Sequence, residues 1–286
     1  MKVKTILVFL AAAAVSALAG CGGSGATEPG TEATKVVASF YPLAFAAREI
    51  GGAGVEVDNL TPAGAEPHDL EVSPGVVRRV REAELVLLLG HGFQPQLEDA
   101  AGGGAGVLAL LDTPGLDRFG NGDPHVWLDP ARFALIVEPI GTALGARDGA
   151  ARLAARLRGL DRELRRGLAR CERRQIVTSH EAFGYLAERY GLEQVAITGL
   201  SPEAEPAARE LERVVEVVRA TGATTVFFET LVSPRIAETV ARETDVRTAV
   251  LNPIEGLTSE EERRGEDYFS LMRANLAGLR EALGCR

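Results

Sequence analysis

Short runs of apolar and β-branched residues alternate with helical patterns along most of the chain, and this alternation limits the fold more than any other feature. The first half carries four strand-like runs, at 36–40, 55–60, 85–90 and 106–111. The second half carries four more, at 175–178, 194–198, 224–228 and 248–251. Strands that alternate with helices are typical of βαβ units, whose strands form parallel sheets. The sequence therefore predicts two α/β lobes, each built on a parallel sheet.

Residues 131–173 interrupt the alternation. They are rich in alanine, leucine and arginine and contain no strand-like run. This composition predicts a long connecting helix that can bend at Pro139 and Gly145. The expected organisation is an N-terminal lobe at 35–130, the connecting helix at 131–173 and a C-terminal lobe at 174–286.

The first twenty residues read as an export signal and not as part of the fold. Lys2 and Lys4 give a positive start, and an apolar run follows at 6–19. That run is shorter than the ~20 residues that a membrane-spanning helix needs. We therefore interpret residues 1–20 as a cleaved signal peptide and exclude them from the fold.

The four residues at 18–21, Leu-Ala-Gly-Cys, resemble the bacterial lipobox. In that motif the cysteine, here Cys21, carries lipid and becomes the new N-terminus; the alternative is an ordinary cleavage site that happens to precede a cysteine. Residues 21–34 are glycine-rich and polar, which predicts a flexible tether. We expect an extracytoplasmic protein, periplasmic or on the cell surface, held to the membrane by lipid on Cys21.

The chain is acidic and poor in cysteine. Its formal charge is −9, and removal of the signal with its two lysines makes it −11. An acidic surface argues against nucleic-acid binding, which needs a basic patch, and is compatible with a cationic ligand. Cys171 and Cys285 are the cysteines left after the lipid site, and they form either a disulfide or two free thiols.

Three of the four histidines lie in a loop or directly after a predicted strand. They are His68, His125 and His180. Open α/β sheets bind ligands beyond the carboxyl ends of their strands, and two of these histidines belong to the first lobe and one to the second. Together they predict a site in the cleft between the lobes, and imidazole is a common zinc ligand.

Carboxylates next to these histidines in the sequence are candidates to orient the rings. They are Asp69, Asp123 and Glu181.

Six motifs resemble one family, the solute-binding proteins that feed zinc or manganese ABC importers, including zinc-binding lipoproteins of the ZnuA and AdcA type. The resemblance covers nearly the whole mature chain. The motifs are Phe-Tyr-Pro at 40–42, Pro-His-Asp at 67–69, Asp-Pro-His-Val-Trp-Leu-Asp-Pro at 123–130, Thr-Ser-His at 178–180, Phe-Phe-Glu at 227–229 and Leu-Asn-Pro-Ile-Glu-Gly-Leu at 251–257.

The resemblance implies one metal bound between two lobes that a rigid helix joins. It maps the first three ligands onto His68, His125 and His180. Some members use an aspartate where this chain has Asn252, whereas members with an Asn-Pro-Leu-Glu stretch use its glutamate, which maps onto Glu255. We predict Glu255 as the fourth ligand; Glu66, Glu229 and a water molecule are the alternatives.

The metal that the resemblance implies is Zn²⁺, with Mn²⁺ as the alternative. A histidine at the third position resembles the zinc branch, and imidazole suits zinc whereas manganese prefers oxygen ligands. Many zinc-branch members carry a long His- and Asp-rich loop before the second ligand, but residues 113–122 are short and contain no histidine. His91 matches no ligand position, and we interpret it as a loop residue near the cleft.

Three histidines and a carboxylate could also form a hydrolytic zinc site with an open place for water. However, the chain has no His-Glu-x-x-His helix and no serine in a nucleophile elbow. Adhesion is a further alternative that some relatives suggest, although the chain has no repeats or stalk. We expect a monomeric, non-enzymatic binder that delivers its metal to the permease of an ABC importer by a small rearrangement.

Overall fold

The computed structural model describes residues 33–102, 106–117, 122–202, 204 and 206–286. The signal peptide, Cys21 and nearly all of the tether lie outside the described residues. The chain from Ala33 to Arg286 forms one compact unit. Within the described part, no helix combines the length and apolar character needed to cross a membrane.

The N-terminal lobe contains a four-stranded sheet in the order β2-β1-β3-β4, with every pair parallel. Its strands are β1 (Thr34–Ala38), β2 (Val55–Asn59), β3 (Leu85–Leu88) and β4 (Val107–Ala109). Its helices are α1 (Tyr41–Gly51), α2 (Pro74–Glu82) and α3 (Pro95–Ala101). β1 begins at Thr34, so the lobe starts just inside the predicted tether.

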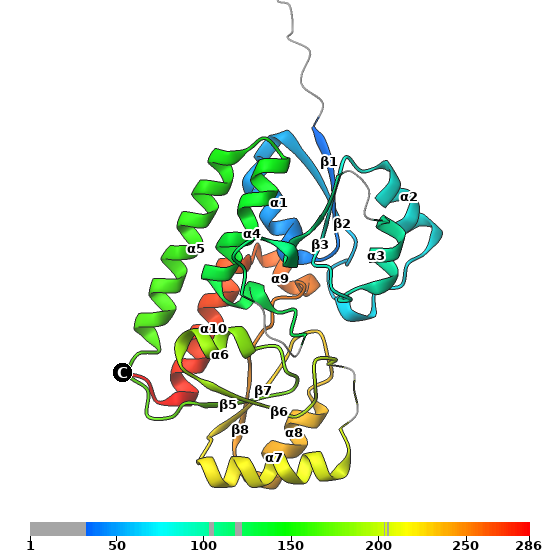
Figure 1. Cartoon of the computed structure of the whole chain (residues 1–286). Helices are drawn as coiled ribbons and strands as arrows, with labels where there is room; N and C mark the ends of the chain where they lie inside the picture. Colours follow the sequence, from blue (N-terminus) through cyan, green and yellow to red (C-terminus); the bar gives the residue numbers. More distant parts are fainter. Residues whose placement is uncertain (1–32, 103–105, 118–121, 203, 205) are drawn as a thin grey trace, which may run out of the picture. The chain divides into compact units, whose positions relative to one another are not determined.

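The C-terminal lobe repeats this plan with a parallel sheet in the order β6-β5-β7-β8 (Figure 1). Its strands are β5 (Gln175–Thr178), β6 (Glu193–Ala196), β7 (Thr225–Phe228) and β8 (Arg247–Val250). Its helices are α6 (Gly184–Tyr190), α7 (Ala208–Thr221), α8 (Arg235–Thr244), α9 (Ser259–Arg264) and α10 (Tyr268–Leu283). The predicted fold class of two parallel α/β lobes is confirmed.

The connecting segment contains two helices where the sequence predicted one. They are α4 (Pro130–Ala143) and α5 (Arg147–Gly167). The chain breaks at Gly145, whose φ of 63° is the left-handed conformation that glycine adopts easily. The break is not at Pro139, which lies inside α4. α5 is the long connecting helix, because it packs against α1 of the first lobe and α10 of the second.

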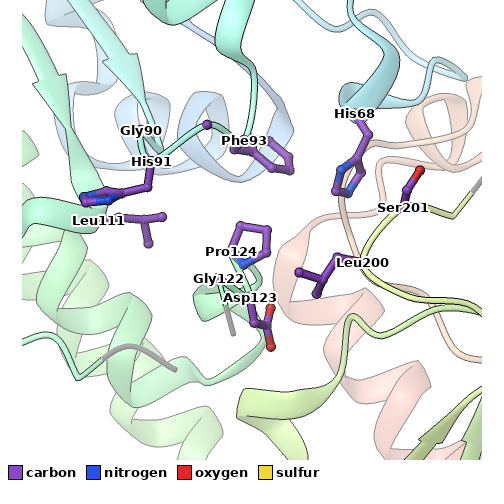
Figure 2. Close-up of a pocket in the computed structure, with 11 residues that line it drawn as sticks. His68, Gly90, His91, Phe93, Leu111, Gly122, Asp123, Pro124, Leu200 and Ser201 are labelled. Atoms are coloured by element: carbon purple, nitrogen blue, oxygen red, sulfur yellow. The ribbon is translucent and has the colours of Figure 1, made fainter. Parts of the chain in front are cut away.

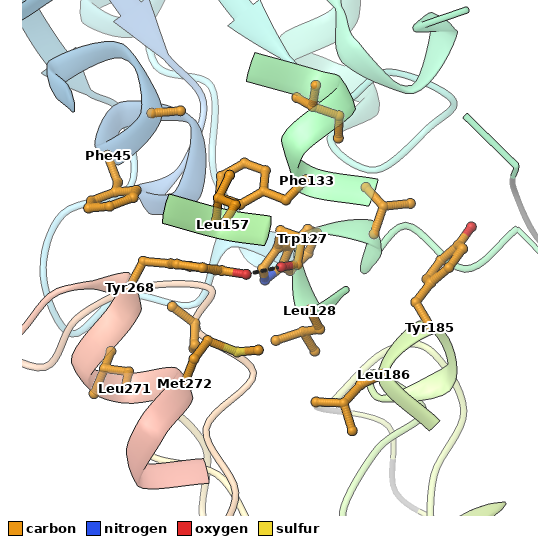
Figure 3. Packing of buried hydrophobic residues seen from close by; sticks show 14 of the residues in the cluster. Phe45, Trp127, Leu128, Phe133, Leu157, Tyr185, Leu186, Tyr268, Leu271 and Met272 are labelled. Carbon is orange, nitrogen blue, oxygen red and sulfur yellow. Dashed lines mark hydrogen bonds between the residues drawn. The ribbon is translucent and has the colours of Figure 1, made fainter. Parts of the chain in front are cut away.

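One hydrophobic core cluster spans both lobes, and each lobe also has a smaller cluster of its own. The shared cluster includes Phe45 from α1, Phe133 from α4, Leu157 from α5 and Tyr268 and Met272 from α10, all buried (Figure 3). The Tyr268 hydroxyl donates a hydrogen bond of 2.5 Å to the Trp127 carbonyl, across 141 residues of sequence. Tightly packed interiors resist deformation, so this shared core limits how far the lobes can move apart.

Cys171 and Cys285 form a disulfide, which settles the alternative that the sequence left open. The backbone N–H groups of Glu172 and Arg173 also donate to the Leu283 carbonyl. The end of α10 is therefore fastened to the segment that leads from α5 into β5.

Candidate metal centre

The two histidines of the N-terminal lobe are positioned by carboxylates close to them in the chain. His68 lies in a 3-10 turn, Pro67–Asp69, where the Glu66 side chain accepts the His68 N–H at 3.2 Å. His125 precedes a second 3-10 turn, Val126–Leu128, and Asp123 accepts its N–H at 2.9 Å. These hydrogen bonds therefore fix the backbone at His68 and at His125.

His180 lies two residues beyond the end of β5, at the carboxyl edge of the C-terminal sheet. The strand order of this sheet reverses there, between β5 and β7. The His180 carbonyl accepts hydrogen bonds from the Thr178 hydroxyl at 2.8 Å and the Gln194 amide at 2.9 Å. This is the place where parallel α/β sheets hold ligands. The fold therefore explains why the third histidine points towards the first lobe.

Glu255 is presented by a strained turn. Ile254, just before it, has a φ of 58°, which is a rare conformation for a β-branched residue. The Asn252 side chain accepts the Ile254 N–H at 2.7 Å, while the Asn252 backbone exchanges hydrogen bonds with Asn275. Asn252 thus shapes the turn, and it is Glu255 that reaches the histidines.

The Glu255 turn is also braced against the first lobe. The Trp127 indole N–H donates to the Pro253 carbonyl at 2.8 Å, and both residues are buried. The turn and His125 are therefore held by the same rigid neighbour, Trp127.

Four predicted residues converge on one point: His68, His125, His180 and Glu255. One donor atom from each lies within 4.8 Å of the others. The Nε2 atoms of His68, His125 and His180 are 3.3, 3.0 and 3.7 Å from Glu255 Oε1. The Nε2 atoms of His125 and His180 are 3.4 Å apart.

Four of the six separations between these donor atoms, 3.0 to 3.7 Å, are close to those of a tetrahedral zinc site, and all four atoms lie within 4.8 Å of one another. Four donors at zinc–ligand distances of about 2.0–2.1 Å lie ~3.3 Å from one another when they occupy the corners of a tetrahedron. The second oxygen of Glu255, Oε2, is buried and has no hydrogen-bond partner among the described residues. A buried carboxylate oxygen without a donor indicates a place for a cation.

Carboxylates orient two of the three rings. His125 Nδ1 is 2.7 Å from Asp123 Oδ1, and His180 Nδ1 is 2.6 Å from Glu229 Oε1. An ionised carboxylate can only accept, so each Nδ1 donates and leaves Nε2 to face the metal position. Ser179 donates a further short hydrogen bond to the same oxygen of Glu229.

The sequence predicted one of these two partners correctly. Asp123 orients His125 as expected, but the carboxylate on the His180 ring is Glu229 and not its neighbour Glu181. Glu229 follows β7, which pairs with β5, so sheet order brings it beside His180. Asp69 is exposed, and no hydrogen bond joins it to the His68 ring among the described residues.

The buried charges shift one another's pKa values. Burial opposes a charged His180, but hydrogen bonds to Glu229 and Glu255 outweigh it and raise the His180 pKa to about 10. The His125 pKa is raised in the same way by Asp123 and Glu255. Burial would raise the Glu255 pKa, yet the three imidazoles hold it well below its ordinary value. The raised pKa values of His125 and His180 therefore favour their protonated forms next to an ionised Glu255.

Glu66 adds a second carboxylate at the edge of the cluster. Burial, together with the nearby charge of Glu255, raises the Glu66 pKa to about 8. One of its oxygens accepts the His68 N–H, while the other is buried without a partner among the described residues.

A cavity of about 570 Å³ adjoins the cluster on the side of His68. Figure 2 shows His68 and Phe93 above Pro124 and Asp123, with Leu200 and Ser201 on the same side as His68. The His68 side chain is 14% exposed, whereas those of His125, His180 and Glu255 are fully buried. His91 lines the far end of this cavity and contacts Asp112, so it lies near the cleft but outside the cluster.

A family model described as "Zinc-uptake complex component A periplasmic" (ZnuA) matches residues 36–282. The chain belongs to the ZnuA family. Family members are uptake components, which agrees with the expectation of a binding protein and not an enzyme.

Curated relatives support the same membership. The high-affinity zinc uptake system protein ZnuA of Bacillus subtilis is 30% identical over 309 residues, covering 96% of this chain and 97% of the relative. The zinc-binding lipoprotein AdcA of Streptococcus pneumoniae is 34% identical over 276 residues, covering 86% of this chain. The chain spans about half the length of the AdcA relatives, 55%.

Solved structures confirm the fold. The zinc-bound ZnuA-like domain of S. pneumoniae AdcA superposes with a TM-score of 0.75 at 34% identity, covering 88% of this chain and 99% of that domain. The laminin-binding protein Lmb of Streptococcus agalactiae, described as having adhesin and metal-transporting activity, superposes with a TM-score of 0.80 at 29% identity, covering 87% of this chain and 99% of that protein.

Proposed function

We propose that this protein captures Zn²⁺ outside the cytoplasm and delivers it to the permease of an ABC importer. The observation that carries this proposal is the convergence of three imidazole nitrogens and one carboxylate within 4.8 Å of one another, with three of the four side chains fully buried. The names of the ZnuA and AdcA relatives, which describe zinc uptake and zinc binding, support it.

The proposed ligands are Nε2 of His68, His125 and His180 and one oxygen of Glu255. Three neutral imidazoles and a carboxylate favour zinc over manganese, which prefers oxygen donors. With Glu255 as the fourth ligand the metal has no open place for an activated water, which separates a carrier from a hydrolase. Manganese is the alternative cargo.

The proposed anchoring follows from the N-terminal motif. Residues 1–20 act as the signal peptide. Lipid on Cys21 and the tether at 21–34 hold a monomeric binding unit near the membrane. This unit has lobes at 35–130 and 174–286, joined through 131–173. The relative named a lipoprotein supports this location. Because the two lobes share one core, we expect release to need a local rearrangement around His68 more than a wide hinge opening.

The experiment is metal competition on the chelator-stripped chain. The protein is offered equal zinc and manganese, and the bound metal is measured by native mass spectrometry. We expect one zinc per chain and a large rise in thermal midpoint with zinc. Glu255→Ala and His180→Ala should each weaken both.

Glu181→Ala is the matched control, because it changes a carboxylate next to His180 that does not orient its ring. Zinc binding by that variant should equal that of the unaltered chain. Retention of manganese over zinc, or of no metal, would contradict the proposal.

A further inference from the structure

The connecting helix α5 carries a charge that differs from the rest of the chain. It holds seven arginines and three acidic residues, a formal charge of +4 in a chain of −9, which leaves −13 on the remainder. The solvent-facing helices of the C-terminal lobe are balanced. α7 has three arginines and three glutamates, and α8 has two of each.

The arginines of α5 are all exposed, and most have no acidic partner. Arg156 pairs with Glu49 and Arg165 with Asp161. The arginines without an ion pair among the described residues are Arg147, Arg152, Arg158, Arg162 and Arg166.

The spacing of these arginines opposes helix stability. Arg158 and Arg162, like Arg162 and Arg166, stand four residues apart, where side chains of an α-helix are neighbours and like charges repel. A helix that is merely solvated usually places opposite charges at this spacing, as ion pairs between Glu and Arg do. A local conflict of this kind is expected where a surface meets an anionic partner.

Apolar surface adjoins the basic face. A groove of about 760 Å³ lies between α4 and α5, and its lining includes Ala131, Ala134 and Leu135 of α4 and Ala151 of α5. Leu135 is 39% exposed, one of two large apolar side chains so exposed in the described part of the chain. Arg147, Arg158, Arg162 and Arg189 line the same groove and outnumber its two carboxylates, Glu138 and Asp161, of which Asp161 pairs with Arg165 and Arg189. Arginines beside an exposed leucine are the chemistry of a membrane interface, where phosphates meet acyl chains.

We propose that the exposed face of α5, with the rim of the α4–α5 groove, docks on an anionic phospholipid surface. The face follows one outer edge of the unit in Figure 1, and its 21 residues extend ~31 Å at 1.5 Å per residue. A basic helix face of this length fits an extended anionic surface better than it fits a small peptide. Negative headgroups attract basic residues within a Debye length of about 8–10 Å.

The proposed anchor permits this orientation. From Cys21 to Ala33 the chain can extend ~40 Å, which exceeds the length of α5. The cavity beside His68 stays uncovered, because none of the residues that line it belongs to α4 or α5. The inference uses the anchoring proposed above but does not depend on metal binding.

The test places a fluorophore on exposed alanines of two helices in the full chain reconstituted with vesicles. Ala155→Cys marks α5, and Ala220→Cys marks α7 as the matched control. Quenching by a headgroup-labelled lipid is compared on phosphatidylcholine and on vesicles with roughly 30% phosphatidylglycerol. We expect quenching at residue 155 on the anionic vesicles and none at residue 220.

Neutralising the face should remove the effect. In the triple variant Arg147→Gln/Arg158→Gln/Arg162→Gln, the quenching that depends on anionic lipid should fall at least about fivefold. About fivefold is the contribution of a single basic residue near such a surface. Salt of about 0.5 M should lower the quenching of the unaltered chain in the same way. Zinc binding by the triple variant should be unchanged, so failure here leaves the proposed function intact. Equal quenching at both helices, equal quenching on neutral vesicles, or no quenching on either would overturn the inference; the last result would favour an acidic protein as the partner.

Discussion

The two sides of the metal centre differ in how firmly they hold their ligands. On the buried side, His125 and His180 are fully covered, and each ring donates Nδ1–H to a carboxylate. On the open side, His68 borders the cavity, and its ring packs edge-on against Phe93 at 4.8 Å between centroids. We infer from this difference that the buried side would fix the geometry of a bound ion, while His68 would control its access and release.

The largest expected effect comes from removing a ligand on the buried side. His180→Ala should lower zinc affinity by well over ~100-fold, because loss of an orienting partner alone costs 10–100-fold. His68→Ala should cost less and release zinc faster, since water from the cavity can take its place. Competition with a fluorescent chelator measures both. Equal losses for the two variants would contradict the inferred difference between the buried and the open side.

Removing the carboxylate that orients His180 should have the next largest effect. Glu229→Gln keeps the size of the side chain but weakens its hold on the ring, so we expect zinc affinity to fall ~10–100-fold. Glu181→Gln is the control and should bind zinc normally. Isothermal titration calorimetry with a competing chelator distinguishes them; a loss in the control alone would return the orienting role to Glu181.

The pH dependence of the thermal midpoint should also reveal the proton on buried His180. Because the folded His180 pKa is raised from 6.5 to about 10, its proton stabilises the metal-free protein fully below pH 6.5, and that contribution is lost as pH rises towards about 10. The thermal midpoint of the metal-free protein should therefore fall over this window, and His180→Asn should lack that component. A midpoint that rises over the same window in the metal-free protein would contradict this assignment.

Zinc must displace that proton when it binds. Calorimetry in buffers of different ionisation enthalpy should detect at least one proton released per zinc near neutral pH. Glu229→Gln should release fewer, because the His180 pKa then loses its main support. Binding without proton release would contradict a protonated His180 in the metal-free cluster.

The smallest effect is expected on the open side, at Phe93. Phe93→Ala removes the ring that supports His68 and widens the cavity, so zinc dissociation should become severalfold faster with little change in affinity. Stopped-flow release to a chelator measures the rate. Leu111→Ala, which alters the same cavity away from His68, should have less effect; the reverse order would place the access route elsewhere.

The sequence predicted the elements better than the contacts between them. All eight strands follow from their apolar runs, and the positions of three histidines after strands or in loops identified His68, His125 and His180, whereas Glu255 followed only from the family resemblance. Glu229 was missed as the partner of His180, because their proximity depends on β5 pairing with β7 and not on sequence distance. The Cys171–Cys285 pair, 114 residues apart, likewise needed the docking of α10.

The break in the connecting segment is a subtler case. Pro139 and Gly145 both marked places where a helix can bend, but Pro139 is accommodated within α4 and the chain turns at Gly145. Only packing separates the two outcomes, since α5 folds back against α4 after that turn. A residue pattern cannot by itself specify this packing.

We propose that zinc is enclosed by three imidazoles and the Glu255 carboxylate. X-ray absorption spectroscopy of the zinc-loaded protein tests it most directly. We expect four ligands at about 2.0–2.1 Å from zinc, with scattering from three imidazoles and no sulfur. In Glu255→Ala the oxygen contribution to the spectrum should change. Five or six ligands, fewer than three imidazoles, or a spectrum that Glu255→Ala leaves unaltered would contradict it.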